Sequence, residues 1–447
     1  MRMPAFSALR HFSSLHSVRP LRQPRRPLRR TPGRRPSVLL AVVALALASA
    51  GCQQLPVNLQ VSISPGAGAD QLSRQSLNRL SSQMAREFMQ NNPGVNLHLR
   101  YIPEAQLLDI LSARSSLGVG PDLMITRAAP AQALAQKGLS RPSELTPAQL
   151  APLAIKYLAG FRQGHRYLAL PFLVQPSLAC YDRRRIDAPP QRLGDLVRLA
   201  SEGKRIGLPL LFNELLWTAT GFGAEDPLIR LLDGARASNG KPGLEPADRK
   251  AALAWLQWLY RANVEPTLKF LDNGDELVQA LAVGKLDWIS CNATAIRRLR
   301  RDLGANLAVS PLPRTKDGEP SRAFARLLLI SFGRDSNPEE RRVAQKFALF
   351  VLNDYSQNNL MERAVGNMPV NQTVIVPVKN APELAAMEQS LASSIVPDFR
   401  SGVGVTRLAQ PISQLLKQTI YGDLRPAEAL QQIEALAEAS QPGGQGR

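Results

Sequence analysis

Residues 167–186, YLALPFLVQPSLACYDRRRI, constrain the fold of this chain more than any other stretch. Two short apolar runs are separated by Gln175, Pro176 and Ser177, and three arginines end the second run. Short apolar runs bounded by prolines or charges are typical of buried strands. We therefore expect two strands that carry the backbone from one lobe into another, which places Gln175 and Ser177 where the lobes face each other.

The length of the chain favours the same two-lobe organisation. The chain has 447 residues, and a single hydrophobic core stops growing at about 250–300 residues. A hydrophobic content of 44% is ordinary for a soluble globular protein and supplies sizeable cores. Aromatic residues make up only 5%, which is little for a site that would hold a carbohydrate on an aromatic platform.

Much of the net charge of +19 lies near the N-terminus. Ten arginines precede residue 36, and the first acidic residue is Asp70. Without residues 1–51 the chain has 45 basic and 36 acidic residues, a net charge of +9. This remaining surplus is scattered along the sequence, so we expect no nucleic-acid partner.

Residues 1–51 have the organisation of a signal peptide. An arginine-rich segment precedes an apolar run at residues 37–50, SVLLAVVALALASA, which is too short to span a membrane. The sequence SAGC at 49–52 resembles a bacterial lipobox, with serine at a position that prefers leucine. It favours lipidation of Cys52, which predicts a membrane-anchored protein in the periplasm or another extracytoplasmic space. Simple cleavage after Ala50 remains the alternative.

Export would place the mature chain in an oxidising compartment. Apart from Cys52, the chain has only Cys180 and Cys291. Both lie near the ends of predicted strands that could flank a cleft. A disulfide and two buried apolar thiols remain equally open at this point.

Strand and helix patterns alternate along most of the mature chain, which indicates α/β lobes. Alternating apolar residues predict strands at residues 57–64 and 95–101, and short apolar runs predict strands at residues 122–126, 205–211, 286–291, 307–311 and 323–332. Helical spacing predicts helices at residues 70–90, 104–115, 128–137, 192–201, 213–221, 246–262, 275–283, 295–303, 337–351, 382–394 and 426–439. The tail, residues 441–447, is predicted to be disordered.

A turn at residues 292–294 ends one predicted strand and opens a helix. Such a turn offers free backbone N–H groups and the positive end of a helix dipole. It therefore suits hydroxyl, carbonyl or anionic groups of a ligand.

Several short sequence segments, which occur in a characteristic order along about residues 57–439, resemble those of a known protein family. The chain resembles the large extracellular solute-binding proteins of bacterial ABC importers (family 1), of the maltodextrin-binding and related sugar-binding type. These segments are residues 120–122, 134–139, 171–181, 280–285, 308–313, 338–352 and 366–371.

The resemblance implies an α/β, two-lobe periplasmic-binding-protein type II fold with a ligand cleft at the hinge. It implies a first lobe of residues 57–178 plus 309–355 and a second lobe of residues 179–308 plus 356–440. A small-molecule solute, most simply a sugar or polyol, would close the lobes, and the closed monomer would deliver it to permease subunits in the membrane. A ligand can favour closure only by contacting both lobes.

The sequence departs from the family where sugar binders place aromatic residues. Thr126, Ala129 and Pro130 stand where relatives often carry an aromatic and charged pair, and Thr294 replaces a conspicuous tryptophan. Trp217 could supply a stacking platform, although its helical spacing also suits a core residue. The expected ligand-binding residues are Ser64, Arg127, Gln175, Trp217, Asn292 and Thr294.

Arg127 has two interpretations at this level. It could pair with a carboxylate or phosphate of the ligand, or it could be an ordinary surface arginine beside the cleft.

No catalytic constellation is evident, and we expect no enzyme activity, no metal and no cofactor. The two histidines of the mature chain, His98 and His165, are not in a metal-ligand spacing. No C-x-x-C or G-x-S-x-G motif occurs. The alternative from another class is a membrane-tethered sensory or structural lipoprotein that keeps the binding-protein fold.

Overall fold

The computed structural model describes residues 56–64, 71–238, 243–397, 399 and 403–440. The chain divides into two units, Met1–Gln54 and Leu55–Arg447. The predicted signal peptide, Cys52 and the tail 441–447 lie outside the described residues, so the statements about them remain predictions.

The first sheet has seven strands in the order β14-β7-β13-β3-β1-β2, with β4 paired to β13. β1, β2 and β3 run parallel, and β13 runs antiparallel to both β3 and β7. The carboxyl ends of β1, β3 and β7 therefore share one edge with the amino end of β13. The strands are β1 (Val57–Ile63), β2 (Val95–Tyr101), β3 (Leu123–Arg127), β4 (Ser140–Arg141), β7 (Leu170–Gln175), β13 (Arg326–Gly333) and β14 (Met368–Pro369).

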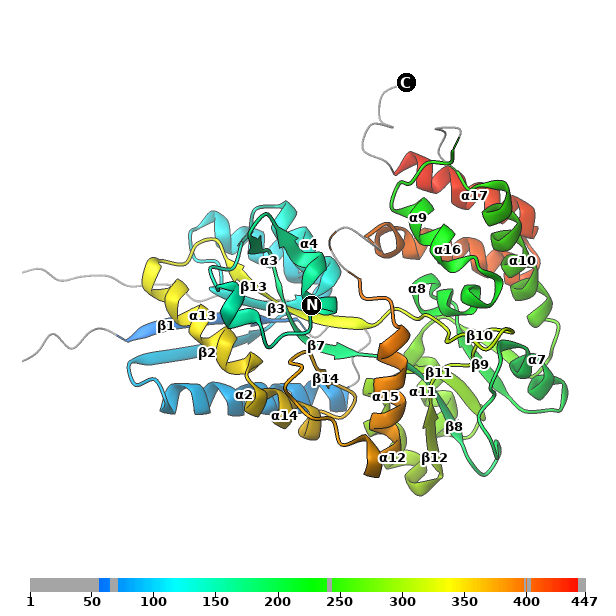
Figure 1. The fold of residues 1–447 in the computed structure, drawn as a ribbon, viewed down its shortest axis with the longest axis horizontal. Helices are drawn as coiled ribbons and strands as arrows, with labels where there is room; N and C mark the ends of the chain where they lie inside the picture. Colours follow the sequence, from blue (N-terminus) through cyan, green and yellow to red (C-terminus); the bar gives the residue numbers. More distant parts are fainter. Residues whose placement is uncertain (1–55, 65–70, 239–242, 398, 400–402, 441–447) are drawn as a thin grey trace, which may run out of the picture. The chain divides into compact units, whose positions relative to one another are not determined.

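Alternation along β3 shows how the first sheet is covered. Leu123 and Ile125 belong to the large core cluster, and Met124 between them belongs to a smaller cluster. One face carries α2 (Gln71–Gln90), α13 (Pro338–Leu352) and α14 (Asp354–Arg363); the other carries α3 (Glu104–Ser116) and α4 (Ala128–Gln136) (Figure 1). Successive side chains of a strand point to opposite faces, so β3 is buried on both.

The second sheet has five strands in the order β10-β9-β11-β8-β12. β9, β10 and β11 are parallel, and β8 runs antiparallel to β11 and β12. The carboxyl ends of β9, β11 and β12 therefore share an edge with the amino end of β8. The strands are β8 (Ser177–Asp182), β9 (Ile206–Pro209), β10 (Leu268–Leu271), β11 (Trp288–Asn292) and β12 (Leu307–Ser310).

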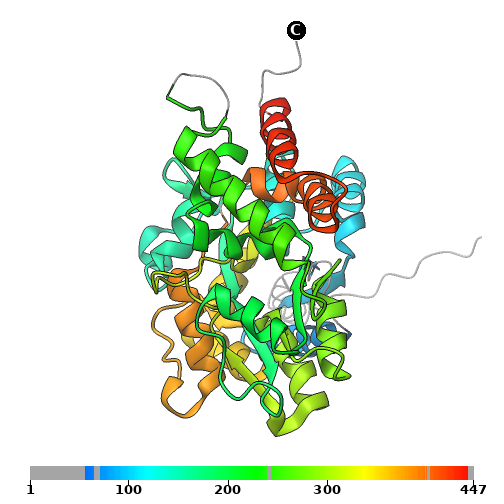
Figure 2. The same cartoon turned by 90° about the vertical axis from the view of Figure 1, so that its right-hand side faces the viewer.

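The two faces of the second sheet are also covered by helices. Leu178 and Cys180 point toward α11 (Gly274–Ala282) and α12 (Ile296–Leu303) within the large cluster, whereas Ala179 and Tyr181 point into a separate core. That second core packs the following helices: α7 (Leu193–Ser201), α8 (Phe212–Leu215), α9 (Glu225–Leu232), α10 (Pro246–Ala262), α16 (Val403–Tyr421) and α17 (Pro426–Ala439). Figures 1 and 2 both show α16 and α17 beside α10.

Short elements complete the described part of the chain. They are α5 (Pro147–Leu150), α6 (Ile155–Leu158), η1 (Ala159–Phe161), β5 (Arg162–Gln163), β6 (Arg166–Tyr167), η2 (Leu216–Phe222), η3 (Ala293–Ala295), η4 (Gly304–Asn306), η5 (Val378–Asn380) and α15 (Pro382–Ser393).

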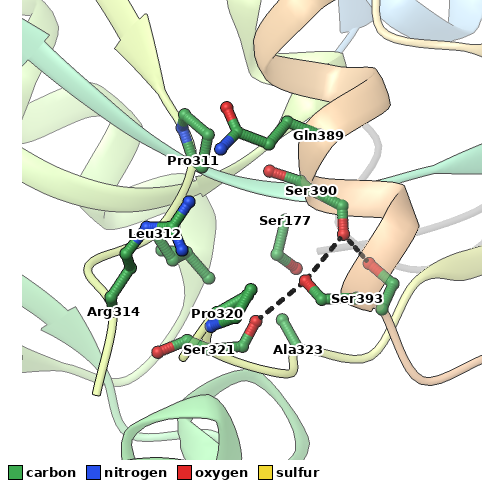
Figure 3. A pocket seen from close by; sticks show the side chains of 11 residues that line it. Ser177, Pro311, Leu312, Arg314, Pro320, Ser321, Ala323, Gln389, Ser390 and Ser393 are labelled. Atoms are coloured by element: carbon green, nitrogen blue, oxygen red, sulfur yellow. Dashed lines mark hydrogen bonds between the residues drawn. The ribbon is translucent and has the colours of Figure 1, made fainter. Parts of the chain in front are cut away.

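The chain passes between the two sheets in several places. β7 continues into β8 through Pro176, and residues 311–325 connect β12 back to β13. Ile395, which follows α15, exchanges backbone hydrogen bonds with Ala323 and Ala325 of this return connection (Ala325 N to Ile395 O, 2.9 Å; Ile395 N to Ala323 O, 2.9 Å). Ser393 at the end of α15 also donates its hydroxyl to the Ser321 carbonyl at 3.2 Å (Figure 3).

The strand pairing differs from the predicted lobe boundaries in two places. β12 extends to Ser310 and pairs with β8, so residues 309–310 belong to the second sheet rather than to the first lobe. Met368 and Pro369 pair with Val174 and Leu173 of β7, and α14 packs against α2, so these later residues accompany the first sheet. Sequence spacing could not show this, because both assignments depend on partners distant in the chain.

α16 is a helix that the sequence analysis missed. Pro411 lies inside it and Gly404 lies near its start, and both residues usually mark helix boundaries. The spacing of its apolar residues was nevertheless helical. Its buried apolar side chains are Val405, Leu408, Ile412, Leu416 and Ile420.

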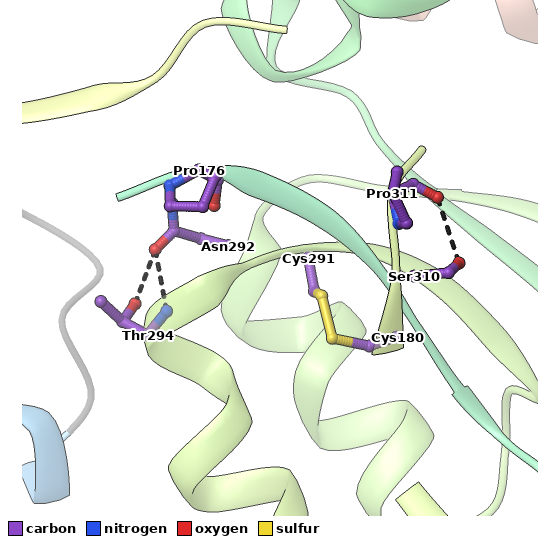
Figure 4. The surroundings of a disulfide bond; sticks show 7 residues. All are labelled: Pro176, Cys180, Cys291, Asn292, Thr294, Ser310 and Pro311. Carbon is purple, nitrogen blue, oxygen red and sulfur yellow. Dashed lines mark hydrogen bonds between the residues drawn. A yellow bond between two sulfur atoms is a disulfide. The ribbon is translucent and has the colours of Figure 1, made fainter. Parts of the chain in front are cut away.

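A disulfide joins Cys180 of β8 to Cys291 of β11, the alternative that the sequence had left open (Figure 4). The two cysteines are diagonal neighbours, since Cys180 lies opposite Ile289 and Cys291 opposite Leu178. Their Cα atoms are 5.9 Å apart, within the range that a disulfide requires. The bond therefore links β11 to β8, the strand through which the chain enters the second lobe.

Arg322 fixes the return connection to the second lobe. Its backbone N–H donates to Thr220 Oγ1 at 3.2 Å, and its guanidinium lies 3.3 Å from Glu225 and 2.7 Å from Asp226. Burial raises the pKa of the Glu225 carboxyl to about 7, against the opposing effect of Arg322. Glu225 is 3% exposed and its Oε1 has no hydrogen-bond partner, which is consistent with a dominant desolvation effect.

Replacing Glu225 with glutamine is expected to reduce the loss of stability between about pH 5 and pH 8. Because the folded-state pKa is raised, the stabilising contribution is complete below the unfolded value near 4.5 and is lost as pH rises through about 7. The parent should lose on the order of 2–3 kcal/mol over this interval, and the variant should lose much less. Urea unfolding at several pH values measures the difference. An equal pH dependence in the parent and in Glu225→Gln would contradict the assignment.

Candidate functional site

The carboxyl edge of the first sheet brings together three of the residues expected from the sequence. Ser64 directly follows β1, Arg127 ends β3 and Gln175 ends β7. Arg326, at the amino end of β13, lies directly opposite Gln175 in the strand register. Ligands of open α/β sheets bind outside the carboxyl ends of the strands, so this edge is the candidate face of the first lobe.

The carboxyl edge of the second sheet presents Asn292 and Thr294. The Asn292 Oδ1 atom accepts hydrogen bonds from the Thr294 backbone N–H at 3.1 Å and from the Thr294 hydroxyl at 2.8 Å (Figure 4). The Asn292 Nδ2 group donates to the Pro176 carbonyl at 3.4 Å. Asn292 thus caps η3 at the end of β11 and reaches the residue that joins β7 to β8.

A loop of the first lobe packs against this turn. The Gln175 Nε2 group donates to Asn367 Oδ1 at 2.8 Å, and Asn367 Nδ2 donates to the Ala364 carbonyl at 2.8 Å. Gly366 has φ +93°, and a Cβ atom there would lie 2.3 Å from the carbonyl oxygen of Ala293. Gln175 directly precedes Pro176, and Asn292 bonds the Pro176 carbonyl, while the backbones of Gly366 and Ala293 approach each other closely.

An ion pair that the sequence analysis missed connects the two lobes at these edges. Arg326, at the start of β13, pairs with Glu214 of α8, the helix that follows β9. Their side chains are 31% and 22% exposed, respectively, so the pair is partly removed from water. A single glutamate in the apolar segment LPLLFNELL and a single arginine before the apolar strand LLLISF were the available signals. Nothing in the sequence indicated that these two residues, 112 positions apart, would pair.

Arg127 is already engaged by an acidic residue of its own lobe. Its Nε and Nη2 groups donate to the two carboxylate oxygens of Glu104 at 2.8 and 2.6 Å. This bidentate pair neutralises the guanidinium and holds it beside α3. The interpretation of Arg127 as a free partner for a ligand carboxylate therefore does not describe this structure.

Trp217 is in the core of the second lobe and not at the cleft. Its side chain is 1% exposed and belongs to the same cluster as Phe212 and Trp255. Leu215 and Leu216 before it and Thr218 and Ala219 after it are also buried, so this part of the chain points inward. The expected aromatic platform from Trp217 is corrected accordingly: no face of this ring is available for stacking.

Ser64 places a buried hydroxyl group at the carboxyl end of β1. Its backbone N–H donates to the Ile125 carbonyl at 2.8 Å, which extends the pairing of β1 with β3. Its side chain is 0% exposed, and the hydroxyl has no hydrogen-bond partner. A buried hydroxyl without a partner is unfavourable by about 1–3 kcal/mol, and this one lies at the candidate edge.

Two further properties of the described residues concern membrane spans and metal sites. None of the helices described is long and apolar enough to cross a membrane. Within the same residues, no three or more histidine, cysteine or acidic side chains are grouped so as to hold a metal ion.

Comparison with known proteins gives one family match and several similar folds. The family model described as "Bacterial extracellular solute-binding protein" matches residues 83–386. No curated protein is significantly similar to the chain in sequence.

Among solved structures, similar folds include a cyclo/maltodextrin-binding protein complexed with maltotetraose. It has a TM-score of 0.68 and 17% identity over 86% of this chain and 97% of the other. The GacH receptor of Streptomyces glaucescens, studied unliganded and with acarbose, has a TM-score of 0.68 and 16% identity over 85% and 97%. Maltose-bound MalE3 of T. maritima has a TM-score of 0.64 and 15% identity over 85% and 99%. These similarities confirm the predicted two-lobe fold.

Proposed function

The chain belongs to the family of bacterial extracellular solute-binding proteins, and on this premise we propose that it captures a small solute between its lobes for an ABC importer. The captured solute is a sugar or polyol, and membrane permease subunits receive it from the closed protein. The protein acts as a monomer, and its role is binding and not catalysis.

One observation carries this proposal: polar groups from the carboxyl edges of both sheets converge on the connection at Pro176. Gln175 belongs to the first lobe, Asn292 to the second, and the Arg326–Glu214 pair joins the same two edges. A solute that replaces or joins these contacts touches both lobes at once. Such two-sided contact is the requirement for a ligand to favour closure.

The nature of the solute is inferred from the chemistry of the edges. The similar proteins named above were studied with maltotetraose, acarbose and maltose. Amide and hydroxyl side chains such as Gln175, Asn292 and Thr294 suit sugar hydroxyls, which both donate and accept hydrogen bonds. With Trp217 buried and Thr294 in the turn after β11, we infer that hydrogen bonds contribute more than stacking, which favours a short sugar or polyol over a long oligosaccharide.

The cellular location is part of the same proposal. The Cys180–Cys291 disulfide is of the kind that persists in oxidising compartments. Together with the predicted signal peptide, it supports a periplasmic or other extracytoplasmic protein. Lipidation at Cys52 supplies the proposed membrane anchor.

Screening sugars, polyols, amino acids and phosphorylated compounds by thermal shift is expected to identify a solute that stabilises the protein. Ligand at 100 times its Kd adds about 2.7 kcal/mol to the free energy of unfolding. Gln175→Ala and Asn292→Ala should each weaken binding of that solute about 10-fold or more, because each loses hydrogen bonds that hold the convergent edges. Isothermal titration calorimetry measures the two Kd values.

The matched control is Asn96→Ala, an exposed asparagine of β2 that bonds Asn58 near the opposite, amino edge of the sheet. It should bind the solute as the parent does. If both edge variants bind as tightly as the parent while remaining folded, the site lies elsewhere.

A further inference from the structure

A polar pocket lies beside the return connection, on the flank of the second sheet formed by β12. Its volume is about 30 Å³, and a cavity needs about 10–15 Å³ to hold one water molecule. It therefore has room for a group of a few heavy atoms. Its lining includes Ser177 of β8, Arg314 and Ser321 of the return connection, and Ser390 and Ser393 of α15 (Figure 3).

The pocket adjoins the candidate solute site, because Ser177 lies opposite Asn292 in the strand register, but none of the side chains assigned to the solute lines it. In the strand order, β8 lies between β11 and β12. Asn292 ends β11 and Thr294 follows it, whereas the pocket is formed by Ser177 at the start of β8, by residues that follow β12 and by α15, which packs against β8 and β12. The side chains assigned to the solute site, including Gln175 and the Arg326–Glu214 pair, do not line it.

Ser390 presents an unsatisfied hydroxyl to this pocket. Ser390 is 9% exposed, and its Oγ atom has no hydrogen-bond partner. The neighbouring serines are satisfied: Ser321 donates to the Pro313 carbonyl, and Ser393 donates to the Ser321 carbonyl at 3.2 Å. Figure 3 shows the Ser390 hydroxyl on the side of α15 that faces Pro311 and Leu312. A buried hydroxyl of this kind needs a partner.

Arg314 gives the pocket its charge. It is the single charged residue among the 11 that line the pocket. Its Nη1 group donates to the Gly318 carbonyl at 2.9 Å, and it forms no ion pair with the acidic residues of the described chain. A guanidinium has five N–H donors, so most of its donors remain for another acceptor. A serine hydroxyl and a guanidinium without a carboxylate partner together suit a small anion with oxygen acceptors.

We propose that this pocket binds a small oxyanion, a carboxylate or phosphate group, held by Arg314 and by the Ser390 hydroxyl. The site is additional to the solute cleft and does not depend on the identity of the solute. Because Arg314 belongs to the return connection and Ser390 to α15, a bound oxyanion links two segments that are far apart in sequence. Binding therefore stabilises the folded protein.

The test is the thermal stability of the whole protein in sodium phosphate and in sodium acetate, with sodium chloride at the same ionic strength as reference. We expect phosphate, acetate or both to raise the Tm saturably. Arg314→Gln should weaken binding of the anion at least 10-fold, and Ser390→Ala should weaken it several-fold. A response to phosphate alone identifies a tetrahedral oxyanion, and one to acetate alone identifies a carboxylate. Arg261→Gln, at an exposed arginine of α10, should respond as the parent does.

The proposal is overturned if neither anion raises the Tm beyond the chloride reference. It is also overturned if Arg314→Gln retains the full response. Should Arg314→Gln fail to fold, Ser390→Val decides the question, because it removes the hydroxyl and fills the pocket; an undiminished response in that variant rules the site out. No sugar is present in these experiments, so their outcome is independent of the proposed solute.

Discussion

Replacing Cys180 and Cys291 together with alanine is expected to lower the free energy of unfolding by about 2–4 kcal/mol. The disulfide closes a loop between residues separated by 111 positions, so its loss frees a long segment in the unfolded chain. Both cysteines are buried, at 0% and 7% exposure, and alanine avoids introducing a buried hydroxyl at either position. Urea denaturation monitored by tryptophan fluorescence measures the loss.

The reduced parent protein is the control for this prediction. Dithiothreitol added to unfolded parent should lower its stability toward that of the double variant, and the double variant should not respond. Equal stability of parent and double variant under oxidising conditions would show that the bond contributes nothing.

Replacing Gly366 with alanine is expected to destabilise the protein by at least about 2 kcal/mol and to weaken solute binding. The residue has φ +93°, which alanine adopts only with strain, and the new Cβ atom would lie 2.3 Å from the Ala293 carbonyl oxygen. The loop must then move away from η3. That movement displaces Asn367, the hydrogen-bond partner of Gln175.

Gly138→Ala separates the effect of backbone strain from the effect of the clash with Ala293. Gly138 also has positive φ, at +64°, but a Cβ atom there meets nothing within 4 Å. It should lose only about 1 kcal/mol, from backbone strain alone. Similar losses at both positions, measured by urea denaturation, would contradict the close packing of the Gly366 loop against the second lobe.

Much of the fold could be predicted from local patterns. The strands around Pro176 are bounded by prolines and charges, and they lie where the sequence placed them, as β7 and β8. The helix beginning after Asn337 was also predicted, because the asparagine cap is a local signal; its side chain accepts from the backbone of Glu339 and Glu340. α16 was missed because Pro411 and Gly404 outweighed a regular apolar spacing.

The candidate site was predictable only where it depends on strand ends. Gln175 and Asn292 could be named as candidates from the sequence because each ends an apolar run, and the strand topology brings their two edges to the same connection. The Arg326–Glu214 pair, the Glu104 partner of Arg127 and the position of Gly366 against Ala293 depend on contacts between distant segments. Trp217 was ambiguous for a related reason: helical spacing does not reveal which face of a short helix is covered.

The distance between the lobes with and without solute tests the central claim most directly. Spin labels at Gln106→Cys and Glu276→Cys suit this measurement, since both residues are exposed in helices that follow carboxyl strand ends, one in each lobe. Cys180 and Cys291 are bonded to each other, so replacing Cys52 with serine leaves the two labelling sites as the free thiols.

With the solute that raises the Tm most, pulsed electron paramagnetic resonance should report a shorter distance between the labels. Asn292→Ala at the same solute concentration should keep the solute-free distance. A solute that binds with a Kd measured by calorimetry yet leaves the distance unchanged would contradict capture between the lobes.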